Sequence, residues 1–211
     1  MSFIERKRRA RPITREQLLA LPNLLTYGRI AVVPLVVLLM LGINDADPSS
    51  LRLNQFLGWV TTLVLTAAGI SDIVDGYYAR KYGATSSFGK FLDPLADKLI
   101  AFAILIMLIP LRRLAAWVVV ILMTRDITIT ALCSLAVGEG LEISASEWGK
   151  RKTLMQNFAM GFLLIHYPFH EIQCHQVGMI LIGMTLFISV GSGLHYIWTF
   201  FSEVLQKKRG S

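Results

Sequence analysis

The chain has 211 residues, of which 54% are hydrophobic and only 17% charged, and it carries a formal net charge of +7. This length suits one domain, and the excess of apolar residues excludes an ordinary soluble protein. The apolar residues occur in runs of about 20, the length that a helix needs to cross a bilayer, so we expect an all-α, polytopic membrane protein.

Six transmembrane helices are predicted, preceded by a short interfacial helix. We expect the six-helix domain to cover residues 23–204, between a cytoplasmic basic arm at 1–22 and a cytoplasmic tail at 205–211. The predicted spans are 24–42, 56–79, 91–110, 114–137, 152–168 and 176–201.

The arm begins MSFIERKRRARP and ends at the first predicted span. Thr14 and Gln17 have the spacing of a helix capping box, and three leucines follow them before Pro22. This pattern predicts a short helix that lies on the membrane surface. The arm lacks the short apolar core and small-residue cleavage site of a signal peptide, so we do not expect cleavage.

Lys and Arg residues are distributed unevenly between the predicted loops. With a cytoplasmic amino terminus, and with the boundary residue Lys152 counted in its loop, the inside segments hold fifteen of them and the outside segments hold three, which are Arg52, Arg112 and Arg113. The positive-inside rule therefore places both termini in the cytoplasm. Because topology and contact with anionic lipid account for the positive charge, we expect membrane lipid and no nucleic acid as a partner.

Four aspartates occur where the second span ends and the third begins, in the stretch SDIVDGYYARKYGATSSFGKFLDPLADK at 71–98. Asp72 and Asp75 are three residues apart, and Asp93 and Asp97 are four apart, so each pair lies on one face of a helix. The short connection predicts antiparallel neighbours. All four carboxylates are then expected to converge at the cytoplasmic face.

Carboxylates gathered near hydrocarbon repel one another unless cations neutralise them. Oxygen ligands suit Mg²⁺ or Mn²⁺, and two such ions about 4 Å apart are known to clamp a displacement at phosphorus. Gly76 and Gly89 leave space for a ligand, and Arg80 offers a planar fork for a phosphate. Spacing alone leaves two other interpretations open, a structural cluster paired with nearby Lys and Arg, and an ion or proton path.

The segment reads D-x2-D-G-x2-A-R-x8-G-x3-D-x3-D, which resembles the signature of the CDP-alcohol phosphotransferase family. The resemblance implies a six-helix fold, a homodimer and metal-dependent transfer from a CDP-linked lipid. It favours an enzyme over both other interpretations. The matching positions are Asp72, Asp75, Gly76, Ala79, Arg80, Gly89, Asp93 and Asp97.

The resemblance also implies a role for each matching residue. Asp72, Asp75 and Asp93 would be ligands of two Mg²⁺ or Mn²⁺ ions, and Asp97 would both contact a metal and act as general base. The stretch LPNLLTYGR is similar to the family's segment at the start of the first helix. The implied contacts to the CDP-diacylglycerol headgroup are Asn23, Thr26, Gly76, Ala79, Arg80, Ser86 and Gly89.

Two further features bear on the acceptor alcohol. Arg125 lies near the middle of the fourth predicted span, where a lone arginine is unfavourable unless it faces a polar cavity. Lys150 and Lys152, in the segment GKRKT, lie at the cytoplasmic start of the fifth span. A pocket that joins them would suit the phosphate of an acceptor. Alternatively, Arg125 pairs with Asp126 or with a motif aspartate, and the lysines only mark topology.

The segments LPNLLTYGRI, FGKFLDPLADK and GKRKT are most similar to the bacterial branch of the family whose acceptor is sn-glycerol 3-phosphate. This similarity implies an active site at the cytoplasmic face of the bacterial inner membrane. One departure matters, because that branch usually has Arg-Glu where this chain has Arg125-Asp126. Arg-Asp is similar to the branch that uses phosphatidylglycerol, so that acceptor and inositol phosphate stay open.

Overall fold

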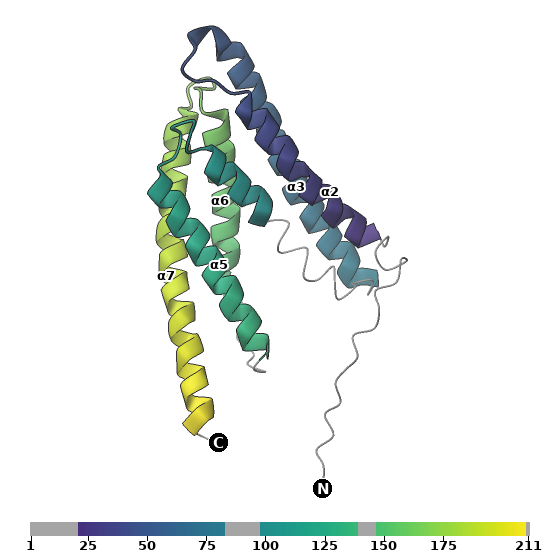
Figure 1. The fold of residues 1–211 in the computed structure, drawn as a ribbon, viewed down its shortest axis with the longest axis vertical. Coiled ribbons are helices and arrows are strands. Elements are labelled where there is room, and N and C mark those ends of the chain that lie inside the picture. Colours follow the sequence, from purple (N-terminus) through teal and green to yellow (C-terminus); the bar gives the residue numbers. More distant parts are fainter. Residues whose placement is uncertain (1–20, 83–97, 139–146, 210–211) are drawn as a thin grey trace.

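The chain folds into long helices that run side by side (Figure 1). The computed structural model describes the backbone of residues 21–82, 98–138 and 147–209. It describes the side chains of residues 28–71, 98–136, 149 and 151–203. The predicted interfacial helix in the arm lies outside the described residues.

Each predicted span overlaps a helix in the described residues, although 91–97 of the third span lie outside them, and no strand occurs in the described part of the chain. The all-α prediction is therefore confirmed for these residues. The helix between α3 and α5 is described from residue 98 to residue 107. The other elements are α2 (Leu21–Leu41), η1 (Pro48–Ser50), α3 (Leu51–Tyr82), α5 (Ala116–Gly138), α6 (Glu147–Ile165) and α7 (Cys174–Arg209).

Three helical stretches are long and apolar enough to cross a bilayer, and they are Pro48–Ser71, Ala116–Ala136 and Cys174–Glu203. The apolar helices Gly28–Leu41 and Lys98–Met107 are shorter within the described residues. The membrane class of the chain thus has direct support from three helices. A total of six spans stays a prediction.

Successive helices alternate in direction, which gives the molecule two distinct ends (Figure 1). The start of α2 and the end of α7 lie at one end, which we call the terminal end. The connections at 42–50, 108–115 and 166–173 lie at the opposite end, which we call the loop end. The carboxyl end of α3, which carries the first half of the aspartate motif, lies at the terminal end.

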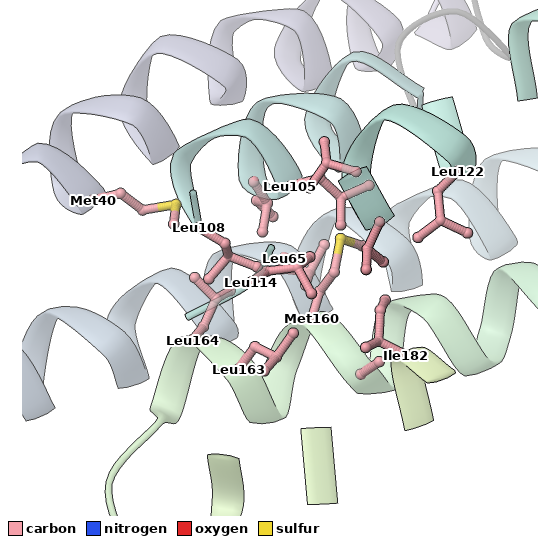
Figure 2. Close-up of a cluster of buried hydrophobic side chains, with 14 of the residues drawn as sticks. Met40, Leu65, Leu105, Leu108, Leu114, Leu122, Met160, Leu163, Leu164 and Ile182 are labelled. Carbon is pink, nitrogen blue, oxygen red and sulfur yellow. The ribbon is translucent and has the colours of Figure 1, made fainter. Parts of the chain in front are cut away.

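An apolar core joins the helices (Figure 2). Large apolar side chains also cover the outside, where Phe187 is 82% exposed and Trp198 is 75% exposed. Apolar surface on both sides of a helix suits a protein surrounded by lipid, which is as apolar as its interior. The labelled core residues are Met40, Leu65, Leu105, Leu108, Leu114, Leu122, Met160, Leu163, Leu164 and Ile182.

Gly58 allows α3 to approach the end of α6 closely. A Cβ atom at this position would lie 2.5 Å from the carbonyl oxygen of Leu164, which is much too short for a real contact. This glycine is therefore required by packing. It fixes the distance between two helices that both contribute to the pocket described below.

A buried arginine holds the loop end together. Arg113 is only 1% exposed, and its Nε and Nη2 atoms each donate a hydrogen bond of 2.8 Å to the carboxylate of Asp45. Its Nη1 donates to the carbonyl oxygens of Leu164 at 2.7 Å and Leu163 at 3.3 Å. The hydroxyl of Tyr167 also donates to Asp45, at 2.8 Å. These bonds tie the connection at 42–50 to the carboxyl end of α6.

Candidate active site

The first half of the aspartate motif continues a regular helix. The backbone of α3 is helical through Tyr82, so positions 72 and 75 are on one face of it. Leu65, Ala68 and Gly69 precede position 72 at helical spacings of seven, four and three residues, and all three line a pocket. The motif therefore begins one turn beyond that pocket, on the same face of α3.

Several predicted site residues are not described. The side chains of Asn23, Thr26, Asp72, Asp75, Gly76, Ala79, Arg80 and Lys150 lie outside the described residues, although their backbone is helical. Ser86, Gly89, Asp93 and Asp97 lie outside them altogether. The convergence of the four aspartates and their roles stay predictions.

The pocket has a volume of about 420 Å³, within the range of small-molecule sites. Its walls come from α3, the helix over 98–107, α5 and α6, so it lies between four elements of the bundle. The lining residues with polar side chains are Lys98, Arg125, Asp126, Thr130, Lys152, Thr153, Gln156 and Asn157.

Arg125 and Lys152 lie in this same pocket, linked through Asp126. The Lys152 Nζ atom donates to both carboxylate oxygens of Asp126, at 2.7 and 2.6 Å. Arg125 Nη1 donates to one of these oxygens at 3.1 Å. The sequence offered a phosphate pocket and an ion pair with Asp126 as alternatives. The structure shows that the ion pair lies inside the pocket.

The far side of the Arg125 guanidinium is anchored to α7. Its Nε donates to the carbonyl oxygen of Ser189 at 3.0 Å, and its Nη2 donates to the hydroxyl of Ser192 at 2.8 Å. Gly193 leaves room for this side chain, since a Cβ atom there would lie 3.2 Å from Arg125 Cγ. The guanidinium is thus held in one orientation before any ligand binds.

Lys98 adds a third cation to the pocket, whereas the sequence offered it only as a possible structural partner of the motif aspartates. Its Nζ donates to the hydroxyl of Thr130 and approaches the carbonyl oxygen of Asp126 at 3.5 Å. Its position directly after Asp97 was the available signal. Three cations and one carboxylate give the described lining residues an excess of two positive charges.

Gln156 was also not foreseen. It follows Lys152 by one turn of α6, is 3% exposed and lines the pocket. Its Oε1 atom is buried and has no hydrogen-bond partner within the part of the chain that the structure describes. Nothing in the sequence distinguishes this glutamine from a packed or surface residue. Only the fold places it here.

The described side chains do not by themselves form a metal site. Among the described residues no group of three or more His, Cys, Asp or Glu could hold a metal. The motif supplies four carboxylates, and oxygen donors are what Mg²⁺ and Mn²⁺ prefer. The chemistry of these donors therefore fits a divalent ion.

The comparisons with known proteins agree with the motif. A profile of CDP-alcohol phosphatidyltransferases matches residues 19–191, which is most of the chain. The chain belongs to the CDP-alcohol phosphatidyltransferase family. The predicted family and the prediction of an enzyme are thus confirmed. Members of this family use divalent metal ions in general.

Relatives with assigned names match more than four fifths of the chain. The chain is 35% identical over 188 residues to the CDP-diacylglycerol–glycerol-3-phosphate 3-phosphatidyltransferase of Bacillus subtilis. The matched region covers 87% of this chain and 94% of that relative. The protein of the same name from Haemophilus influenzae is 32% identical, over 84% of this chain and 91% of the relative. A probable phosphatidylglycerophosphate synthase of Mycobacterium tuberculosis is 33% identical, over 87% of this chain and 82% of the relative. This phosphatidyltransferase is thus a membrane protein with bacterial relatives.

Proposed function

We propose that this phosphatidyltransferase transfers the phosphatidyl group of CDP-diacylglycerol to sn-glycerol 3-phosphate. The products are phosphatidylglycerophosphate and CMP. The observation that carries this proposal is the cationic pocket, which adjoins the motif through α3 and through Lys98. The names of the relatives support the same acceptor.

The charge of the pocket favours a phosphate monoester over a phosphodiester. A monoester carries a charge of about −1.5 to −2 at pH 7, which balances the excess of two positive charges among the described lining residues. Phosphatidylglycerol is a diester with a single negative charge, so it would leave the pocket partly unneutralised. A cardiolipin synthase, which uses that acceptor, is therefore the weaker alternative.

Inositol phosphate is also a monoester and meets the same charge requirement. A phosphatidylinositol phosphate synthase is thus the second alternative within the family. The two monoesters differ in molecular size and in the number of their hydroxyl groups. Direct competition between acceptors distinguishes them.

In the proposed reaction, Asp97 takes the proton from the acceptor hydroxyl as that oxygen attacks the β-phosphorus of CDP-diacylglycerol. The bond between this phosphorus and the bridging oxygen breaks, and the bridging oxygen leaves with CMP. Arg80 holds the leaving phosphate by a charge-assisted contact. Arg125, Lys150 and Lys152 hold the phosphate of the acceptor, which orients its hydroxyl for attack.

Two Mg²⁺ or Mn²⁺ ions would be held by Asp72, Asp75, Asp93 and Asp97. When bound, the ions would neutralise the charge of the pyrophosphate and the charge that develops on CMP. Space for the pyrophosphate comes from Gly76, Ala79 and Gly89, and the remaining headgroup contacts are assigned to Asn23, Thr26 and Ser86.

We further propose a homodimer in the bacterial inner membrane, with both termini and the active site on the cytoplasmic side. The distribution of Lys and Arg supports this orientation. The position of the motif at the terminal end of the bundle agrees with it. The catalytic domain is assigned to residues 23–204.

The test is release of CMP from CDP-diacylglycerol by the purified protein in detergent. Glycerol 3-phosphate, phosphatidylglycerol and inositol phosphate are offered side by side with Mg²⁺ or Mn²⁺, and a sample with EDTA serves as control. We expect turnover with glycerol 3-phosphate that EDTA removes. Turnover with phosphatidylglycerol alone would make the protein a cardiolipin synthase. Failure with every alcohol would contradict the proposed reaction and favour the alternative of an ion or proton path.

A further inference from the structure

Gln156 has a buried acceptor atom to which no described residue donates a hydrogen bond. The residue is 97% buried, it lines the cationic pocket, and its Oε1 has no hydrogen-bond partner among the described residues. Buried polar atoms nearly always have a partner, and an exception in a pocket calls for an explanation. A carbonyl oxygen of an amide can only accept, so the group that completes this site must donate a hydrogen bond.

The phosphate of an acceptor cannot fill this role. A phosphate dianion offers only acceptor oxygens, which the amide oxygen of Gln156 would repel. The cations of the pocket suit the phosphate, whereas Gln156 suits a hydroxyl group. A ligand that satisfies both must carry an anion and a hydroxyl within one small molecule.

The spacing on α6 sets the size of that molecule. Lys152 and Gln156 are four residues apart on one helix and both line the pocket, so their Cβ atoms are about 5–6 Å apart. A phosphate and a hydroxyl separated by two carbons, as the phosphate and the middle hydroxyl of glycerol 3-phosphate are, can lie about this far apart. The pocket therefore suits the phosphate monoester of a short polyol.

We infer that Gln156 determines acceptor specificity by accepting a hydrogen bond from a hydroxyl that does not react. This inference rests on the proposed function, because it concerns the same pocket and the same acceptor. Glycerol 3-phosphate has one hydroxyl to attack the donor and a second, at its middle carbon, for Gln156. An acceptor without that second hydroxyl would leave the buried oxygen unsatisfied.

The experiment compares glycerol 3-phosphate with 3-hydroxypropyl phosphate, which keeps the phosphate and the terminal hydroxyl but lacks the middle one. For the wild-type protein we expect kcat/KM to favour glycerol 3-phosphate by about 5- to 150-fold, mainly through KM. Gln156→Met has a similar volume and no strong acceptor, so its ratio should fall to near one. Gln173→Met, the same substitution at an exposed position of the loop end, should keep the wild-type ratio.

Binding is measured in parallel by calorimetry on wild-type protein in EDTA, where no turnover occurs. This readout needs neither the variant to fold nor the reaction to proceed. Tighter binding of glycerol 3-phosphate supports the inference even if turnover fails and the proposed function falls. Equal affinity for both compounds overturns it, and so does a wild-type preference that Gln156→Met retains.

Discussion

The buried arginine at the loop end gives a quantitative test of what holds the bundle together. Replacing Arg113 by methionine keeps a long side chain but removes all of its donors. The carbonyl oxygens of Leu163 and Leu164 and the carboxylate of Asp45 then lose their bonds to it. We therefore expect Arg113→Met to destabilise the fold.

The size of the effect depends on how well water can replace the Arg113 donors at each acceptor. Removing one partner of a fully buried ion pair costs about 3–5 kcal/mol. The Asp45 side chain is 22% exposed and keeps its bond from Tyr167, so part of this cost is recovered by solvent. We expect a loss of about 2–4 kcal/mol, which for a protein of this size lowers the melting temperature by about 4–16 °C.

The assay is thermal unfolding in detergent, followed by circular dichroism. Arg112→Met is the matched control, because Arg112 is the exposed neighbour and the substitution is the same. The KM for the acceptor should stay unchanged in both variants, since the pocket residues contribute nothing to this contact. Equal melting temperatures for Arg113→Met, Arg112→Met and the wild type would refute the reasoning.

Three further predictions concern the site and the pH dependence of stability. Arg125→Ala should raise the KM for glycerol 3-phosphate by about 10- to 150-fold through loss of charge-assisted hydrogen bonds, and an unchanged KM in the CMP-release assay would place the acceptor elsewhere. Asp97→Asn should abolish turnover while CDP-diacylglycerol binding stays measurable, and a persisting rate would contradict its role as base. Burial alone would raise the pKa of Asp45, but hydrogen bonds from Arg113 and Tyr167 and the charge of Arg113 outweigh it and hold this pKa below its usual value of 3.8. Because its native pKa is lowered, the Asp45 carboxylate contributes stability that is lost as the pH falls through this native pKa and is fully present above pH 3.8. Melting curves should therefore show a steeper loss of stability below that pH for the wild type than for Asp45→Asn.

The helices could be predicted because the apolar runs that cross a membrane are long and continuous. The ends of the helices could not be predicted, because a helix can continue beyond its apolar run into water. The second run was predicted to cover 56–79, whereas α3 covers Leu51–Tyr82. The sixth was predicted to cover 176–201, whereas α7 extends to Arg209.

The family and the placement of Arg125 beside Lys152 could be foreseen for different reasons. The motif has eight fixed positions within one short segment, so it is visible without the fold. A lone arginine within a span demands a polar neighbourhood, which is an argument from energy alone. Arg113 was counted only as a loop charge, because its partner Asp45 is 68 residues away. Contacts of this kind depend on tertiary packing, as does the environment of Gln156.

The length of α3 sets the depth at which the proposed reaction takes place. Its 32 residues span about 48 Å, whereas the hydrocarbon layer is only about 30 Å thick and takes about 20 residues. Measured from Leu51 at the loop end, the helix leaves the hydrocarbon near Ser71, directly before Asp72. The motif then lies level with the lipid headgroups, where the pyrophosphate of CDP-diacylglycerol also lies. In the proposed reaction the lipid would then stay in the bilayer, because the length of α3 places the motif at the same depth as the pyrophosphate.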